Sequence, residues 1–254
     1  MSTDGSPAGL WPEGYERVVL DTVDSTMAEA ARRAASGLDG PTWIMAHRQA
    51  HGRGRRGRDW TSPEGNLAAT LVFRPEATPH EAAKRSFAAA VALFEALSIY
   101  VDRTRLSLKW PNDVLLDGGK VAGILLESAG QGPYVDWLAI GIGVNLATKP
   151  EGLRDAAFPP VAVADEGGPQ VDPEEFLTVL ADAYATEEGK LDAFGFRRMR
   201  EDWLRHAARL GEVITARTGR DEVTGVFETV DEDGNLVLST PQGRRVISAA
   251  DVFF

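Results

Sequence analysis

Apolar residues recur at two spacings along the first 208 residues, and they predict strands and helices in mixed order. Six short runs are alternately or continuously apolar, as half-buried and buried strands are. The predicted strands are Glu16 to Asp21, Trp43 to Ala46, Leu67 to Phe73, Arg105 to Trp110, Lys120 to Glu127 and Val135 to Asn145. We therefore expect an α+β fold.

Capping patterns mark where the helices begin. Thr26 to Glu29 is a capping box that predicts a first helix, and Thr78 to Glu81 is a second box with proline at the first helical position. Behind the second box, apolar residues at helical spacing as far as Leu97 predict one long core helix. Asp172 begins another helix, and the apolar positions from Phe196 to Ala207 predict one more.

The pattern changes after Arg209. Short β-like runs then alternate with turn signals rich in Gly, Asn and Pro, and helical periodicity is absent. We expect a flexible N-terminal segment at residues 1–14, an α+β domain at 15–208 and a small all-β module at 209–254. A Gly/Pro-rich connection from about Lys149 to Gln170 interrupts the α+β domain.

Composition narrows the class of protein. The 254 residues are 43% hydrophobic and 26% charged, an ordinary balance for a soluble globular chain. No apolar run approaches the roughly 20 residues of a membrane span, and Met1 to Gly14 lacks the apolar core of a signal peptide. With no cysteine, disulfides, thiolate metal sites and cysteine nucleophiles are excluded. We expect a cytoplasmic enzyme or binding protein.

The segment Gly52 to Trp60, here called the arginine loop, concentrates four arginines in a chain of net charge -11. Its three interleaved glycines argue against an ordinary helix or strand. Guanidinium groups hold phosphate oxygens bidentately, and glycines let backbone N–H groups approach the same anion. The target is a nucleotide phosphate, nucleic acid or an acidic partner, and the alternative is a solvated loop tip. A pI of about 4.9 argues against bulk nucleic-acid binding.

A second constellation is Lys109-Trp110-Pro111-Asn112-Asp113, followed by Lys120-Val121-Ala122-Gly123-Ile124. Lys109 alternates with apolar neighbours, so it lies on the polar face of its strand. The proline ends the strand, and the next two polar residues are expected to turn the chain. The alternative interpretation is a hairpin turn with two surface lysines.

A third pattern places Gly141, Gly143 and Asn145 on one face of a predicted strand. Such a face indicates close approach by a ligand, another strand or a helix.

Several other chemistries are excluded. The four histidines show no metal-ligand spacing, and Ser128 lacks the glycine frame of a nucleophile elbow. There is no dinucleotide fingerprint or Walker-type loop, so the chain is no classical P-loop ATPase.

Taken in order, these motifs resemble those of the biotin protein ligases. The matching segments are Gly52 to Trp60, Lys109 to Asp113, Lys120-x-x-Gly123-Ile124-Leu125-x-Glu127 and Gly143-x-Asn145. The resemblance extends from about residue 15 to the end of the chain. It implies a class II aminoacyl-tRNA-synthetase-like catalytic domain, a mixed sheet with flanking helices, followed by a small SH3-like β-barrel.

The resemblance also implies a two-step reaction with ATP and biotin as substrates and Mg²⁺ as cofactor. Biotin is first activated as biotinyl-5′-AMP. A lysine of a biotin carrier domain, such as the acetyl-CoA carboxylase carrier subunit, then displaces AMP. Fixed cations stabilise the charge that builds on phosphate and leaving group, and a closed arginine loop keeps water from the intermediate.

The family's functional positions transfer to this sequence residue by residue. The resemblance implies that the catalytic residues are Lys120, Lys109 and Arg55. The biotin-binding residues would be Ser25, Thr26, Gln49, Arg53, Lys120 and Gly123. The ATP- and adenylate-binding residues would be Arg53, Arg55, Arg56, Arg58, Trp60, Asn112, Asn145 and Lys120. Asp113 would position the phosphates or Mg²⁺.

The chain departs from the family pattern in three places. Met27 replaces a residue that is commonly asparagine, so no polar contact is expected there. His51 stands where a small residue is more usual. Too few residues precede Glu16 for the winged helix-turn-helix domain of some members, which predicts a ligase that does not bind operator DNA.

Two rival functions remain open. A lipoate ligase or octanoyl transferase shares the catalytic fold but lacks the arginine loop. A non-enzymatic nucleic-acid-binding protein would use that loop on phosphates, with affinity that falls steeply as salt is added. The oligomeric state, monomer or homodimer, is also left open.

Overall fold

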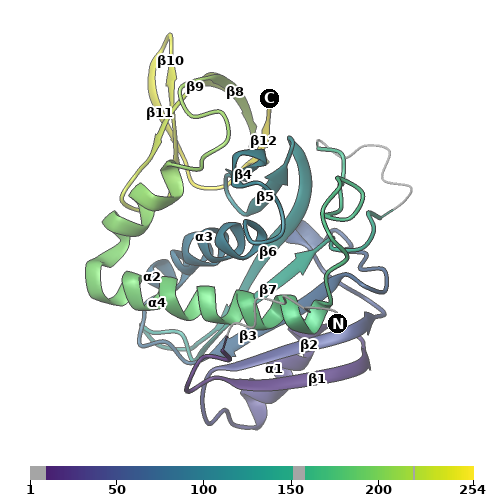
Figure 1. Cartoon of the computed structure of the whole chain (residues 1–254). Helices are drawn as coiled ribbons and strands as arrows, with labels where there is room; N and C mark the ends of the chain where they lie inside the picture. Colours follow the sequence, from purple (N-terminus) through teal and green to yellow (C-terminus); the bar gives the residue numbers. More distant parts are fainter. Residues whose placement is uncertain (1–9, 151–157, 220) are drawn as a thin grey trace.

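The computed structural model describes residues 10–150, 158–219 and 221–254 (Figure 1). Its larger part is a seven-stranded sheet of order β1-β2-β3-β7-β6-β5-β4, in which only the β1–β2 pair is parallel. The strands are β1 (Glu16–Val23), β2 (Thr42–Gln49), β3 (Leu67–Phe73), β4 (Leu106–Lys109), β5 (Asp113–Leu116), β6 (Gly119–Ala129) and β7 (Trp137–Val144).

Helices cover both faces of this sheet. On one face, α3 (Arg85–Leu97) and α4 (Pro173–Leu204) pack on each other and on the strands, and they enclose the main hydrophobic core. On the other face, α1 (Thr26–Ser36) packs on β2, β3 and β7 around a smaller apolar cluster. Side chains of β7 alternate between the two faces: Ile140 and Ile142 belong to the main core, whereas Gly141, on the opposite face, lies against Met27 of α1.

The C-terminal part is a five-stranded antiparallel sheet of order β11-β10-β9-β8-β12. Its strands are β8 (Val213–Arg217), β9 (Glu222–Val230), β10 (Leu236–Thr240), β11 (Gly243–Ile247) and β12 (Asp251–Phe253). Its buried side chains, among them Ile214 and Phe227, join the main hydrophobic cluster. The predicted α+β fold, a mixed sheet with flanking helices followed by a small β module, is confirmed. The division at residue 209 stays a prediction, because the core continues across it.

The predicted helices agree with the structure to different degrees. The first helix is capped at Ser25 and not at Thr26, whose side chain turns instead to Gln49. The capping box at Thr78 is confirmed, yet the helix behind it is broken at Lys84 into α2 (Pro79–Ala83) and α3. The two helices predicted after Asp172 are confirmed: they run on as one element, α4, but are separated by a non-helical kink at Gly195, where φ is 72° (Figure 1).

The segment after Trp110 differs most from its prediction. Asp113 does not turn the chain but begins β5, a strand that the apolar pattern did not reveal. The chain turns between β4 and β5 at Trp110, Pro111 and Asn112, where the Trp110–Pro111 bond is cis. It turns again between β5 and β6 at Asp117 and Gly118, both at positive φ. A short 3₁₀ turn, η2 (Arg103–Arg105), precedes β4.

Two expectations fall partly outside the described residues. The N-terminal segment is described only from Leu10, where Trp11 packs against the main core and its indole donates to the Tyr15 carbonyl at 2.7 Å. Of the predicted connection from Lys149 to Gln170, residues 151–157 are not described. Among the described residues, no helix is long and apolar enough to cross a membrane.

Candidate active site

A cavity of about 710 Å³ opens on the α1 side of the large sheet and reaches β8 and β12 of the C-terminal sheet. All of the predicted site residues except Arg56 line it. Sequence reasoning missed the contributions of Phe158, Arg217 and Asp251. These residues lie at least 14 positions after the end of β7 and outside every motif of the site, so no local sequence pattern indicated that they line the cavity.

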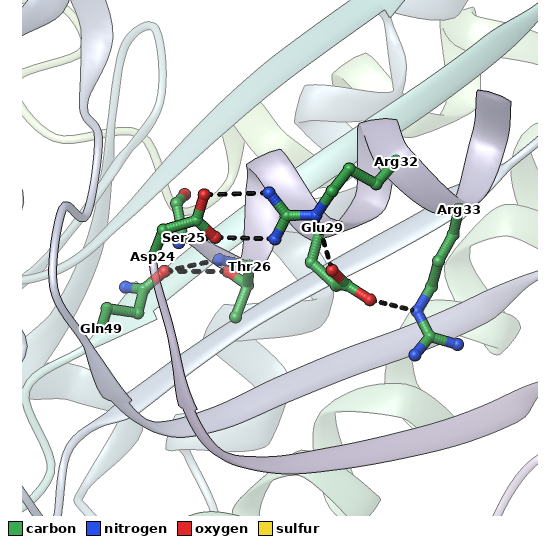
Figure 2. Close-up of polar contacts among 7 residues, drawn as sticks. All are labelled: Asp24, Ser25, Thr26, Glu29, Arg32, Arg33 and Gln49. Atoms are coloured by element: carbon green, nitrogen blue, oxygen red, sulfur yellow. Dashed lines mark hydrogen bonds and ion pairs between the residues drawn. The ribbon is translucent and has the colours of Figure 1, made fainter. Parts of the chain in front are cut away.

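One end of the cavity is polar, and the turn between β1 and α1 builds it (Figure 2). The Thr26 backbone N–H and hydroxyl both donate to Gln49 Oε1, at 2.9 and 3.1 Å. Thr70 donates to the Thr26 hydroxyl at 2.9 Å from β3. The Ser25 hydroxyl is buried and finds no hydrogen-bond partner among the described residues, so it is free for a polar ligand group.

Ionic contacts on the outer side of α1 hold this turn (Figure 2). Arg32 donates to both Asp24 oxygens, at 2.7 and 2.9 Å, and Asp24 Oδ1 also accepts from the Ser25 N–H at 2.8 Å. Glu29 joins Arg32 to Arg33 along the helix. The hydrogen bonds from Arg32 hold the pKa of Asp24 well below its usual range, so the carboxylate stays charged. These contacts hold the backbone of Ser25 through its N–H group.

The middle of the cavity holds two lysines on one buried carboxylate. Lys109 Nζ lies 3.0 Å from Asp113 Oδ2, and Lys120 Nζ lies 2.6 Å from Asp113 Oδ1. Burial lowers the pKa of Lys109, although Asp113 opposes the shift. Burial alone would raise the pKa of Asp113, but the ammonium groups of Lys120 and Lys109 hold it below its usual value. The interpretation of two surface lysines is wrong for Lys109, whose side chain is only 7% exposed.

Asn112 ties this centre to the arginine loop. Its amide donates to the Ile124 carbonyl at 2.5 Å, and its oxygen accepts from Arg55 Nη1 at 3.2 Å. Burial lowers the pKa of Arg55 from its very high usual value. Further along, Asn145 donates to the Val161 carbonyl at 3.0 Å, and its buried oxygen lacks a partner in the described part of the chain.

The glycine face of β7 admits two side chains at close range. A Cβ atom on Gly141 would lie 2.8 Å from Met27 Sδ, and one on Gly143 would lie 2.3 Å from Trp60 Nε1. Trp60 also approaches Gly123 of β6, and the Lys120 ammonium lies 5.4 Å from the indole centroid. The glycines therefore accommodate α1 at one position and the end of the arginine loop at the other, in line with the expected close approach.

The arginine loop folds as a short hairpin with a bridge between Arg53 and Asp59 and a 3₁₀ turn, η1 (Arg55–Gly57), at its tip. Arg56 adopts φ 57°, so the backbone does leave the ordinary regions here. Arg56 and Arg58 reach Asp251 of β12, at 2.5 and 3.2 Å. Arg53 lies 3.5 Å from Glu127. Exposed ion pairs thus hold the loop over the cavity.

The described residues do not favour Mg²⁺ at Asp113. Both of its oxygens are paired with lysines, and no group of three or more His, Cys, Asp or Glu side chains in the described ranges could hold a metal. Mg²⁺ prefers oxygen ligands in an octahedral shell, which two adjacent ammonium groups oppose. The arrangement fits an anion next to the lysines better than a cation next to Asp113.

Comparison with known proteins agrees with this geometry. A sequence model of the Biotin/lipoate A/B protein ligase family matches residues 19–145, and a model of the biotin protein ligase C-terminal domain matches residues 210–254. The chain is 54% identical to the biotin–[acetyl-CoA-carboxylase] ligase of Paracoccus denitrificans, over 93% of this chain and 99% of that protein. The chain belongs to the biotin/lipoate A/B protein ligase family.

Two other members extend the comparison. The bifunctional ligase/repressor of Bacillus subtilis is 29% identical over 94% of this chain and 74% of its own length. The solved biotin protein ligase of Aquifex aeolicus in complex with biotin and ATP aligns with a TM-score of 0.79 at 26% identity, covering 93% of this chain and 98% of that one. Together these comparisons show the family and the fold of the chain.

Proposed function

We propose that this family member is a biotin protein ligase, which activates biotin as biotinyl-5′-AMP and transfers it to a lysine of a biotin carrier domain. The observation that carries the proposal is the lysine pair on Asp113, set between a polar pocket and an arginine-rich loop in one cavity. The names of the relatives support it, since the Paracoccus protein is a biotin–[acetyl-CoA-carboxylase] ligase.

In the first step, the biotin carboxylate attacks the α-phosphorus of ATP, and the bond to pyrophosphate breaks. The ring of biotin lies at Ser25, Thr26 and Gln49, which places its carboxylate toward Lys120. Lys120 and Lys109 present fixed positive charge where the phosphate gains negative charge, at no cost of solvent reorganisation. Asp113 holds both ammonium groups in place between turnovers.

In the second step, the amine of the carrier lysine attacks the carbonyl carbon of the mixed anhydride, and AMP leaves with the electron pair. The same cations stabilise the leaving phosphate. Until the carrier arrives, Trp60 and the arginines cover the adenylate and limit its hydrolysis by water. Asn112 and Asn145 contact the nucleotide, and the unpartnered Asn145 oxygen is open to a donor on it.

The decisive experiment offers the protein two acids and two carrier domains. The purified chain is incubated with ATP, Mg²⁺ and either biotin or lipoate, with an apo biotin carrier domain or an apo lipoyl domain. Mass spectrometry then follows carrier modification. We expect a mass increase with biotin on the biotin carrier alone. Modification with lipoate only would overturn the proposal in favour of a lipoate ligase.

The proposed function also carries four further predictions. The reaction requires Mg²⁺, and its carrier is of the acetyl-CoA carboxylase type. The protein is cytoplasmic and does not bind operator DNA. Adding a chelator to the carrier assay tests the metal, and a gel-shift assay at low and high salt tests DNA binding. Sedimentation separates monomer from homodimer. We also propose that residues 15–208 and 209–254 are distinct domains that share the site, as the separate family matches support.

A further inference from the structure

Met27 lies next to the polar end of the cavity, at the second position of α1. It follows Thr26 directly, it lines the cavity, and only 4% of its surface is exposed. Unlike Ser25, Thr26 and Gln49, it offers no strong hydrogen-bonding group. The ring end of the cavity therefore has polar groups from three residues and an apolar wall from Met27.

The thioether of Met27 lies directly against the backbone of β7. A Cβ on Gly141 would come within 2.8 Å of Sδ and 3.0 Å of Cγ, so a larger residue at this position would require the thioether to shift. The absence of a side chain at Gly141 thus leaves room for Met27 at this point of the cavity wall. Because Met27 also packs in the smaller apolar cluster with Ile44 and Val72, the open space beside it is the cavity, and a larger residue at position 141 would displace the thioether toward the ligand.

The two edges of the biotin ring system match the polar groups and the apolar wall at this end of the cavity. Its ureido edge carries N–H and C=O groups that need partners, and the unpartnered Ser25 hydroxyl and the Gln49 amide supply them. Its thiophane edge is apolar and contains a thioether. A methionine side chain is polarisable and adapts to such an irregular apolar shape.

We infer that Met27 sets the size and polarity of the pocket for the thiophane edge and so decides which ring analogues of biotin the protein accepts. The inference rests on the proposed function. An oxidised analogue such as biotin sulfone adds two oxygens at the ring sulfur, and Met27 rejects it by volume and by the absence of a donor. Met27 is then a residue of specificity and takes no part in the chemical step.

The test compares biotin with biotin sulfone in adenylate formation, measured by pyrophosphate release. Met27→Ala is expected to raise the ratio of kcat/KM for the sulfone to that for biotin by about tenfold or more, as expected for added space in an apolar pocket. Met27→Leu, which keeps most of the volume, should leave this ratio within about threefold of the starting protein. Met199→Ala is the matched control, because Met199 is equally buried but lies in α4 within the main core.

Gly141→Ala provides a second, independent readout. It should raise KM for biotin with little change in kcat, because Met27 is displaced into the pocket. The double variant Met27→Ala/Gly141→Ala should recover most of the affinity. This recovery would not occur if Gly141→Ala acted through general damage to β7. The single variant Gly141→Ala keeps Met27, so its effect on KM can be measured even if Met27→Ala folds poorly.

The outcomes distinguish a failure of the proposed function from a failure of the role of Met27. If the unchanged protein forms no adenylate from biotin, the proposed function fails, and the inference fails with it. If it does form the adenylate, but the sulfone ratio is the same in Met27→Ala and Met199→Ala and the double variant shows no recovery, only the role of Met27 is overturned.

Discussion

The two sets of positive charge around the cavity are built in opposite ways. The lysines pair with Asp113, whose side chain is 11% exposed, and their own side chains are 7% (Lys109) and 29% (Lys120) exposed. Arg56 and Arg58 reach Asp251 with side chains that are 42% and 64% exposed. Buried pairs are costly to break, whereas exposed pairs contribute about 0.2–1 kcal/mol each and are screened by salt. The lysine pair on Asp113, here called the floor of the cavity, is therefore fixed. The arginine loop, here called its cover, can be released.

Removing the central carboxylate should have the largest effect. Asp113→Asn is expected to lower the free energy of unfolding by about 3–5 kcal/mol, because it leaves buried ammonium charge without compensation. Urea unfolding followed by circular dichroism measures this change. The control is Asp117→Asn, at the other end of β5, which removes an exposed pair with Arg105 and should cost less than about 1 kcal/mol. Equal losses of unfolding free energy in Asp113→Asn and Asp117→Asn would contradict the difference drawn between buried and exposed ion pairs.

The pH dependence of the same pair follows from the lowered pKa of Asp113. A carboxyl whose pKa is lower in the folded than in the unfolded state stabilises the fold above the unfolded pKa of about 3.9, and the contribution is lost as pH falls. The stability difference between the unchanged protein and Asp113→Asn should be constant from about pH 5 to 7 and shrink below about pH 4. A difference that grew on acidification would contradict the assigned direction.

Loss of one lysine from the floor should act on the rate. Lys120→Met is expected to reduce adenylate formation by about 10²–10³-fold, the usual effect of removing one preorganised electrostatic group. Pyrophosphate release measures it, and an unchanged circular dichroism spectrum shows that the fold persists. Lys84→Met, at the junction of α2 and α3 outside the cavity, is the matched control. Full activity in Lys120→Met would mean that the central residue is misassigned.

Within the cover, the burial of each arginine should decide how strongly its loss increases release of the adenylate. Arg55 is half-buried and donates to Asn112, whereas Arg58 is largely exposed. Arg55→Ala should increase release of free biotinyl-5′-AMP by about tenfold, as expected for the loss of a charged hydrogen bond, and Arg58→Ala by much less. Chromatography of the ultrafiltrate quantifies the released adenylate. If Arg58→Ala releases as much adenylate as Arg55→Ala, the burial of the arginine does not decide how well the adenylate is retained.

The smallest effect is expected at the far end of the cover. Asp251→Ala removes the partner of both Arg56 and Arg58, so trypsin should cut the arginine loop about two- to fivefold faster, in keeping with weak exposed pairs. At 1 M salt the difference from the unchanged protein should largely disappear, because the Debye length falls to about 3 Å. Asp39→Ala, at an exposed position between α1 and β2, serves as the control.

The sequence was most informative where periodicity and capping act locally. The strand at Leu67 to Phe73 and the helix start at Thr78 agree with β3 and α2 because alternation and cap hydrogen bonds depend on near neighbours. The first helix start was placed one residue late because Ser25 and Thr26 are both good caps. Only the tertiary contact with Gln49 shows that Thr26 is otherwise engaged.

The depth of the site could not be predicted in this way. Lys109 alternates with apolar neighbours, which indicates a polar face, yet that face is closed by Asp113 and by Phe158, whose ring centroid lies 4.5 Å from the ammonium. The link from the arginine loop to Asp251 spans 195 positions in sequence. Pairings of this range depend on how the sheets pack, which no local pattern records.

Trp60 gives the protein an optical reporter of its own. Its indole N–H is buried and has no hydrogen-bond partner in the described part of the chain, and a lysine ammonium lies 5.4 Å from the ring. Indole emission depends on nearby charge and on water, so release of the arginine loop would change the spectrum without any attached dye. The difference between the intact chain and Trp60→Phe isolates that signal from the other five tryptophans. Opening of the site could then be timed directly in a stopped-flow fluorimeter.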